Sequence, residues 1–129
     1  MGPAAKVKAV ETYEWLTGKT FIVHRFDGHV GDAPAASIEV IGPTGADGSL
    51  PVHAYHDSGV ASAWTLKERG PTTWVLTGSW PIAGRDTPVR CTIIDGGDTM
   101  TGRWEYATEG GDWQVSWDVK SRRRGASPR

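Results

Sequence analysis

Apolar and polar residues alternate along most of the chain. In DTMTGRWEYA the large or apolar positions fall on every second residue, and the residues between them are mostly polar. A period of two is typical of a β-strand whose two faces differ. The positions that share one face in three such stretches are Trp74, Leu76, Gly78 and Trp80, then Met100, Gly102, Trp104 and Tyr106, then Trp113, Val115, Trp117 and Val119.

Segments rich in glycine, aspartate and proline recur about every ten residues between these stretches. They divide the chain into eight expected strands, at 19–27, 35–42, 50–57, 60–67, 72–80, 87–95, 98–107 and 112–121. One short helical turn is expected at 10–16, VETYEWL, before the first strand. No long helical pattern separates the strands, so a parallel βαβ arrangement is excluded.

The expected connections are short, which favours antiparallel hairpins. Strands in simple succession leave two open sheet edges unless the sheet closes on itself. The fold class predicted is therefore all-β, an eight-stranded antiparallel up-and-down barrel with a short N-terminal helix. A barrel of this size can hold one small ligand.

The length of 129 residues suits one domain, expected at 1–121 and followed by a basic tail at 122–129. No apolar run approaches the roughly 20 residues of a membrane helix. The N-terminal residues lack the apolar core of a signal peptide. The single cysteine, Cys91, cannot form an intrachain disulfide and is interpreted as a core thiol. We therefore expect a reduced, cytoplasmic protein with no membrane association.

The charge is divided unevenly. The last ten residues carry five of the fourteen basic groups and no acid, which leaves nine basic and fifteen acidic groups in the rest. A basic tail could touch nucleic acid or anionic lipid, but a solvated terminus is the simpler interpretation. The acidic body argues against nucleic-acid binding, which needs a basic face.

Two of the four histidines, His53 and His56, lie three residues apart in PVHAYHDSGV. On a helix they would share a face, but on a strand they point to opposite sides. They therefore cannot chelate one metal together, and no zinc-binding spacing occurs elsewhere. No metal and no cofactor are expected, although a haem with one histidine ligand stays open.

The seven tryptophans allow two interpretations. Large rings fill small cores, which is a purely structural role. Six of them lie on expected strands, however, and rings of this size leave irregular gaps in a small barrel. Two or more of them would then form the flat walls of a ligand cavity.

Four segments resemble a known family: EWLTGKTFIVHR, SIEVIG, AYHDSG and MTGRWEY. They are similar to the small lipocalin-like (calycin) barrels common in actinobacteria, over residues 13 to about 120. The resemblance implies the barrel fold but specifies function poorly, because such barrels bind many ligands and a few are enzymes.

The resemblance also implies site residues. Gly18 matches the glycine that opens the first strand of the family, and Thr20 stands where an aromatic is usual. If position 20 points inward, so does His24. Further matches are Glu39 in IEVIG, Tyr55 before the turn, and Gly102 with Trp104 in the late G-x-W; His56 stands where an acid is usual.

Two polar residues carry the chemistry. His24 is either a core imidazole bonded to a carbonyl or a pocket base. Glu39 is either a strand carboxylate facing water or a general acid–base group. If the protein is an enzyme, these two are the expected catalytic residues. The expected ligand-binding set is His24, Glu39, His53, Tyr55, Trp64, Trp74, Trp104 and Trp117.

Three functions follow. The first is binding of a hydrophobic or aromatic small molecule in the barrel interior. The second is a cyclase, isomerase or hydratase of secondary metabolism that uses the same pocket, with His24 or Glu39 moving a proton. The third is a haem- or nitric-oxide-binding barrel. The sequence leaves a homodimer open.

Overall fold

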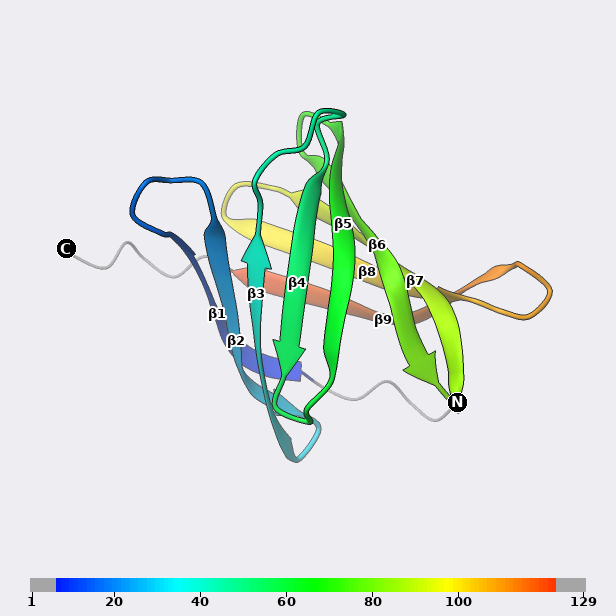
Figure 1. Ribbon diagram of the computed structural model, residues 1–129. Helices are drawn as coiled ribbons and strands as arrows, with labels where there is room; N and C mark the ends of the chain where they lie inside the picture. The colour runs from blue at the N-terminus through cyan, green and yellow to red at the C-terminus, as the bar shows by residue number, and fades with distance from the viewer. Residues whose placement is uncertain (1–6, 123–129) are drawn as a thin grey trace.

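The structure, a computed structural model, describes residues 7–122 and consists there of nine β-strands in one sheet (Figure 1). Each strand pairs antiparallel with the next along the chain. Their bounds are β1 Val7–Trp15, β2 Ile22–Val30, β3 Ala33–Ile41, β4 Leu50–His56, β5 Ala61–Gly70, β6 Thr73–Ile82, β7 Arg85–Asp95, β8 Thr99–Ala107 and β9 Trp113–Arg122. The all-β antiparallel architecture is confirmed.

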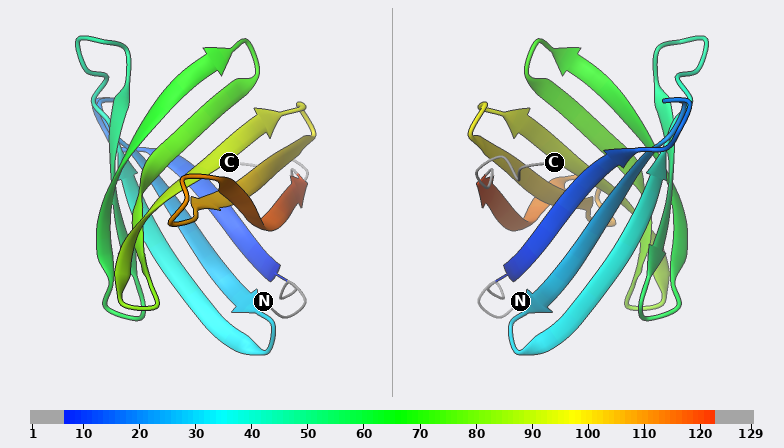
Figure 2. Two further views of the ribbon diagram at one scale, coloured as in Figure 1. Left: turned by 90° about the vertical axis from the view of Figure 1, so that its right-hand side faces the viewer. Right: turned by 90° about the vertical axis from the view of Figure 1, so that its left-hand side faces the viewer.

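The sheet twists and curves into a nearly closed barrel (Figure 2). Its first and last strands meet at a seam where, within residues 7–122, no backbone ladder joins β1 to β9. A side-chain hydrogen bond crosses the seam instead, from Ser121 Oγ to Glu11 Oε2 at 2.9 Å. The barrel is thus completed by side chains rather than by backbone pairing.

The expected N-terminal helix at 10–16 is wrong, because most of this segment belongs to β1 and the strand count is nine instead of eight. VETYEWL contains apolar residues at both helical and strand spacings, so local pattern did not decide between the two. Pairing decided it: β1 forms an unbroken ladder with β2, from Val7 opposite Val30 to Trp15 opposite Ile22.

The ends of β2 also differ from the expected 19–27. The connection from β1 takes up TGKT, with a hydrogen bond from Leu16 N to Phe21 O and positive φ angles of 98° at Gly18 and 56° at Lys19. Gly18 therefore lies in a turn and does not open a strand. At its other end β2 continues to Val30, and the hairpin to β3 is a tight turn at 31–32.

A β-bulge changes the pattern of the last strand. Trp104 pairs with Trp117, but the next residue, Glu105, pairs with Val115. The extra residue reverses the direction of every side chain before it. Trp113 is consequently on the outer face, where the Arg90 guanidinium lies 4.0 Å from its ring centroid, while Trp117 stays inside. The expectation that Trp113 and Trp117 share a face is wrong.

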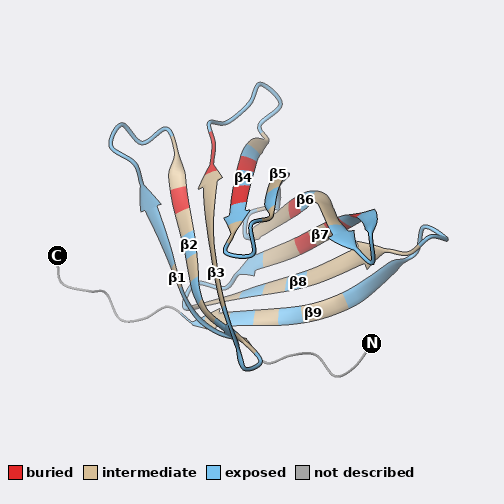
Figure 3. Cartoon of the chain, turned by 60° about the horizontal axis from the view of Figure 1, so that its bottom comes forward, coloured by how far each residue is buried: buried red, intermediate tan, exposed pale blue. Residues whose placement is uncertain are grey.

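The buried core lies on the inner surface and is concentrated on β3–β7 (Figure 3). Its buried members are Ile41, Val52, Ala54, Trp64, Leu76, Val89 and Cys91. None of the buried residues belongs to β1, β8 or β9. The packing is therefore dense on one side of the barrel and sparse beside the seam.

Arg90 and Arg103 pair across strands with Glu105 and Asp118 at 3.0 and 2.8 Å. Residues 7–122 contain no helix that is long and apolar enough to cross a membrane. The proposed basic tail lies outside the described residues except for Arg122, which ends β9.

Candidate functional site

The interior of the barrel holds a cavity of about 440 Å³. Residues from all nine strands contribute to its lining, which reaches Val30, Ser58 and Ile82 beside the hairpin turns at one end. At the other end, packed side chains such as Ile41 and Val52 occupy the interior. The lining follows from the two-residue period of the strands, which turns every second side chain inward.

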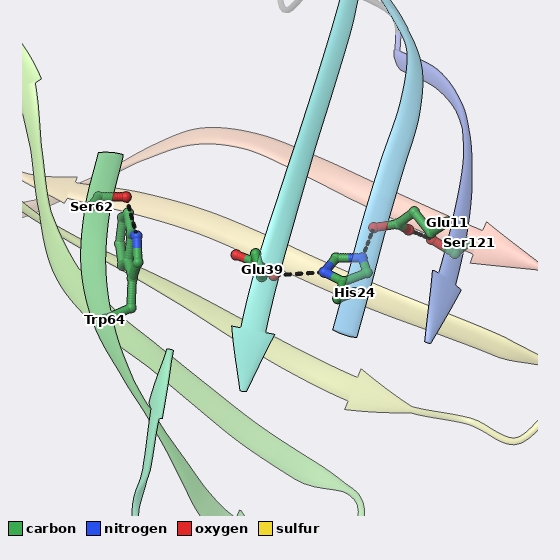
Figure 4. Close-up of polar contacts among 6 residues, drawn as sticks. All are labelled: Glu11, His24, Glu39, Ser62, Trp64 and Ser121. Atoms are coloured by element: carbon green, nitrogen blue, oxygen red, sulfur yellow. Dashed lines mark hydrogen bonds and ion pairs between the residues drawn. The ribbon is translucent and has the colours of Figure 1, made fainter. Parts of the chain in front are cut away.

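Trp64 forms the centre of the aromatic wall. Its ring lies against Gly78, where an added Cβ would come within 2.5 Å of the ring carbon Cε3. A mid-strand glycine thus provides the space that the indole occupies. The rings of Trp80 and Trp104 follow at centroid distances of 6.5 and 5.9 Å. The indole N–H of Trp64 donates to Ser62 Oγ at 2.7 Å, so no buried donor is left over (Figure 4).

His24 lies between two carboxylates on neighbouring strands (Figure 4). Its Nδ1 is 2.6 Å from Glu39 Oε1 on β3, and its Nε2 is 2.9 Å from Glu11 Oε1 on β1. The pairing register explains the first contact, because His24 and Glu39 are direct cross-strand partners. Side chains opposite each other on one face of a sheet are close enough to bond.

This geometry fixes the protonation of His24. An ionised carboxylate only accepts hydrogen bonds, so two of them require an N–H on both ring nitrogens, which is the imidazolium form. Burial alone lowers the pKa of His24, but the hydrogen bonds that His24 donates to Glu11 and Glu39 outweigh it and raise the pKa to about 9. The same bond to His24 lowers the pKa of Glu11 against the opposing effect of burial.

We call Glu11, His24, Glu39 and Ser121 the polar clasp. It runs across β3, β2 and β1 and reaches β9 through the bond from Ser121 to Glu11. The ring of Tyr13 stacks on the imidazole at a centroid distance of 4.2 Å and an interplanar angle of 1°. The clasp therefore lies on the cavity wall and at the barrel seam at once.

The structure brings five of the eight expected ligand-binding residues to the cavity: His24, Glu39, Trp64, Trp104 and Trp117. His53 and Tyr55 do not line it. Both are exposed on the outer face of β4, because the alternating inner positions of that strand are Val52, Ala54 and His56.

Trp74 does not line the cavity either. It has the same parity as Leu76 but lies nearer the start of β6, opposite Ile93 and Glu68. Parity states which face a residue occupies but not how far along the barrel axis the open space extends.

Sequence reasoning missed several lining residues, chiefly Glu11, Tyr13, His56, Trp80 and Ser121. The first two were assigned to the expected helix, although Glu11 and Tyr13 have the alternation of a strand. His56 ends β4, and its ring meets Trp80 edge-on at 4.7 Å. Ser121 carried no local signal, because its partner is 110 residues away in the chain.

Cys91 lines the cavity as a thiol of low reactivity. Burial raises its pKa to about 12, and the nearby carboxylates act in the same direction. The thiolate is the nucleophilic form, and it is scarce here at neutral pH. Within residues 7–122, no group of three or more histidine, cysteine, aspartate or glutamate side chains is arranged to hold a metal ion.

No protein-family model matches the chain, and a search of curated proteins finds no match. The class that the geometry defines is a small antiparallel barrel with an aromatic cavity. The lipocalin-like resemblance remains a prediction.

Proposed function

We propose that the protein binds an apolar small molecule, most readily one with an aromatic ring, inside the barrel. The observation that carries this proposal is the cavity of about 440 Å³ walled by tryptophan rings. Small-molecule sites commonly occupy about 300–1,000 Å³ and combine apolar walls with a few placed polar groups. A lipocalin-like family membership would agree with this function and is proposed with it.

The polar clasp supports a binding role more than base catalysis by His24. A general base has to accept a proton at the working pH. With a pKa of about 9 and both nitrogens already bonded to carboxylates, His24 holds its proton at neutral pH. The enzyme alternative, a cyclase, isomerase or hydratase, thus loses His24 as its expected base. The other expected catalytic residue, Glu39, is bonded through Oε1 to the His24 imidazolium, and we do not propose the enzyme.

The haem alternative is not favoured for a similar reason. An axial ligand needs a free ring nitrogen. Both nitrogens of His24 are bonded to carboxylates, so this residue does not fit that role. His56 also lines the cavity, and its ring meets Trp80 edge-on. This contact is equally expected of a residue that belongs to an aromatic wall, so it does not favour a haem ligand.

The test uses N-phenyl-1-naphthylamine, a neutral probe whose fluorescence rises in apolar surroundings. We expect saturable binding to one site, with a change in tryptophan emission as the rings of Trp64 and Trp104 meet the probe. Absence of saturable binding would contradict the proposal.

A matched pair of variants locates the site. Ala35→Phe places a ring in the cavity lining, whereas Ala63→Phe places the same ring on the exposed outer face of β5. We expect Ala35→Phe to weaken probe binding by about tenfold or more, equivalent to about 1.4 kcal/mol. Ala63→Phe should bind as the parent does. Equal binding by all three proteins would place the probe elsewhere on the molecule.

A further inference from the structure

We propose that the natural ligand is an organic cation, an amine with an apolar or aromatic body whose ammonium group lies against the Glu39 carboxylate. This inference rests on the proposed binding function and specifies the chemical class of the ligand.

Apart from His24, the charged groups that line the cavity are negative. Glu11, Glu39 and Asp57 contribute to the lining, and no lysine or arginine of the described residues does. The imidazolium of His24 compensates one of the two carboxylates that it touches, so the polar clasp retains one negative charge. Asp57 adds a second at the end of the cavity near the turns. An apolar anion entering this space would meet repulsion, and a cation would meet attraction.

One carboxylate oxygen is available for such a cation. Glu11 uses both of its oxygens, one toward His24 and one toward Ser121. Glu39 uses only Oε1, and its Oε2 has no hydrogen-bond partner among the described residues. In Figure 4 this second oxygen points away from His24. The Glu39 side chain is 19% exposed while it lines the cavity, so Oε2 can accept a donor from a ligand.

His24 cannot provide an alternative site for an anion. A cavity imidazolium would ordinarily attract a carboxylate or phosphate through its N–H groups. Here both N–H groups point at Glu11 and Glu39, and one face of the ring is covered by Tyr13. The positive charge is thus screened from the cavity by the two negative groups that hold it.

The aromatic wall suits a cation for an independent reason. Trp64, Trp80, Trp104 and Trp117 line the space together with Phe26 and Tyr106. The faces of such rings carry partial negative charge and attract ammonium groups, most strongly for tryptophan. Carboxylate and rings together form a site in which one end of an amine is charged and the remainder is apolar.

Three naphthalene compounds of nearly equal shape test the charge preference: 1-naphthylmethylamine, 1-naphthalenemethanol and 1-naphthoate. They are cationic, neutral and anionic at pH 7.5. Titration calorimetry should give the tightest binding for the amine, about tenfold tighter than for the alcohol, and the weakest for the naphthoate. Tenfold corresponds to about 1.4 kcal/mol.

Glu39→Gln then identifies the group responsible. This variant keeps the shape and removes the charge, so the ratio of amine to alcohol affinity should fall to about two or less. Glu14→Gln is the matched control, because Glu14 is exposed on the outer face of β1 and does not line the cavity. Its ratio should equal that of the parent protein.

The outcomes separate this inference from the binding function. Equal affinity of the parent for all three compounds, or tighter binding of the naphthoate, would overturn the charge preference while leaving the binding function intact. Failure of the alcohol and of N-phenyl-1-naphthylamine to bind at all would overturn the binding function itself. A ratio unchanged in a folded Glu39→Gln protein would show that Glu39 is not the ammonium partner.

Discussion

The wall formed by β4–β7 and the seam between β1 and β9 hold the barrel together by different interactions. In the wall, consecutive strands pair by backbone ladders and bury Val52, Trp64 and Leu76 almost completely. At the seam, no described backbone ladder exists, and Ser121 bonds to Glu11 instead. Exposed apolar groups such as Val115, which is 48% exposed, flank this side.

The comparison shows which conditions should affect each region. Apolar packing responds to changes in volume and hardly to pH. Ion pairs and hydrogen bonds respond to protonation and to the loss of a single partner. We therefore expect the seam to be the first part of the barrel to open, and it contains the same clasp that faces the proposed ligand.

The largest effect is expected from truncating the wall. Trp64→Ala should lower the free energy of unfolding by about 3–5 kcal/mol, the usual cost of removing a buried ring. Urea denaturation followed by circular dichroism measures it. Trp113→Ala is the control, because Trp113 is 38% exposed and mainly contacts Arg90. Its loss should be about 1 kcal/mol, and equal losses would show that the wall is not the main source of stability.

The second effect is a pH dependence that comes from the seam. The pKa of His24 is raised from near 6.5 to about 9 in the folded state. The folded protein therefore holds a proton that the unfolded chain releases, and the stabilisation is complete below pH 6.5 and disappears as pH rises through 9. We expect the free energy of unfolding to fall by about 2–3 kcal/mol over this interval.

Glu11 sets the acidic limit of the pH range in which the polar clasp stabilises the fold. Its pKa is lowered from 4.5, so its contribution is present above that value and is lost at lower pH. His24→Gln should flatten the fall between pH 6.5 and 9, and His53→Gln, on the exposed outer face, should not. A parent protein with constant stability over this interval would refute the charged clasp.

A third, smaller effect tests the close contact inside the wall. Gly78→Ala places a methyl group about 2.5 Å from the ring of Trp64, so ring or strand has to move. Overpacking of this kind costs about 1–3 kcal/mol. Gly70→Ala is the control, because nothing lies within 4 Å of the added Cβ there. Thermal unfolding of both variants measures the difference, and a neutral Gly78→Ala would mean that Trp64 packs elsewhere.

The smallest effect is expected from the seam bond. Ser121→Ala removes the hydroxyl that donates to Glu11 and should cost about 1 kcal/mol. The more specific result concerns amide hydrogen exchange. Relative to the parent protein, Ser121→Ala should speed exchange more in β1 than in β5. Ser79→Ala, on the outer face of β6, should change neither quantity. Uniform exchange changes across all strands would argue against a local opening.

Local sequence determined the architecture because a strand alternates its side chains regardless of its partners. That period places Trp64 and Trp104 on the inner face without any knowledge of the barrel. The period alone did not fix the orientation of His24, because the phase of its strand was taken from the family resemblance. The turn at 57–60 was also legible, because it carries Asp and Gly at a hairpin position.

Local pattern was insufficient where a distant partner made the choice. Most of the segment 10–16 became a strand through its ladder with β2, and one extra residue in β9 moved Trp113 to the outside. Neither is encoded in the few residues around it. Both depend on which hydrogen bonds the neighbouring strand offers.

The polar clasp is the clearest case of a decision made by tertiary structure alone. Glu11, His24, Glu39 and Ser121 come from four strands and are separated by up to 110 residues. The sequence identified His24 and Glu39 as polar groups on expected strands, but not their common contact. Curvature of the sheet brought β9 back to β1, and each of these partly buried side chains then bonded to at least one of the others.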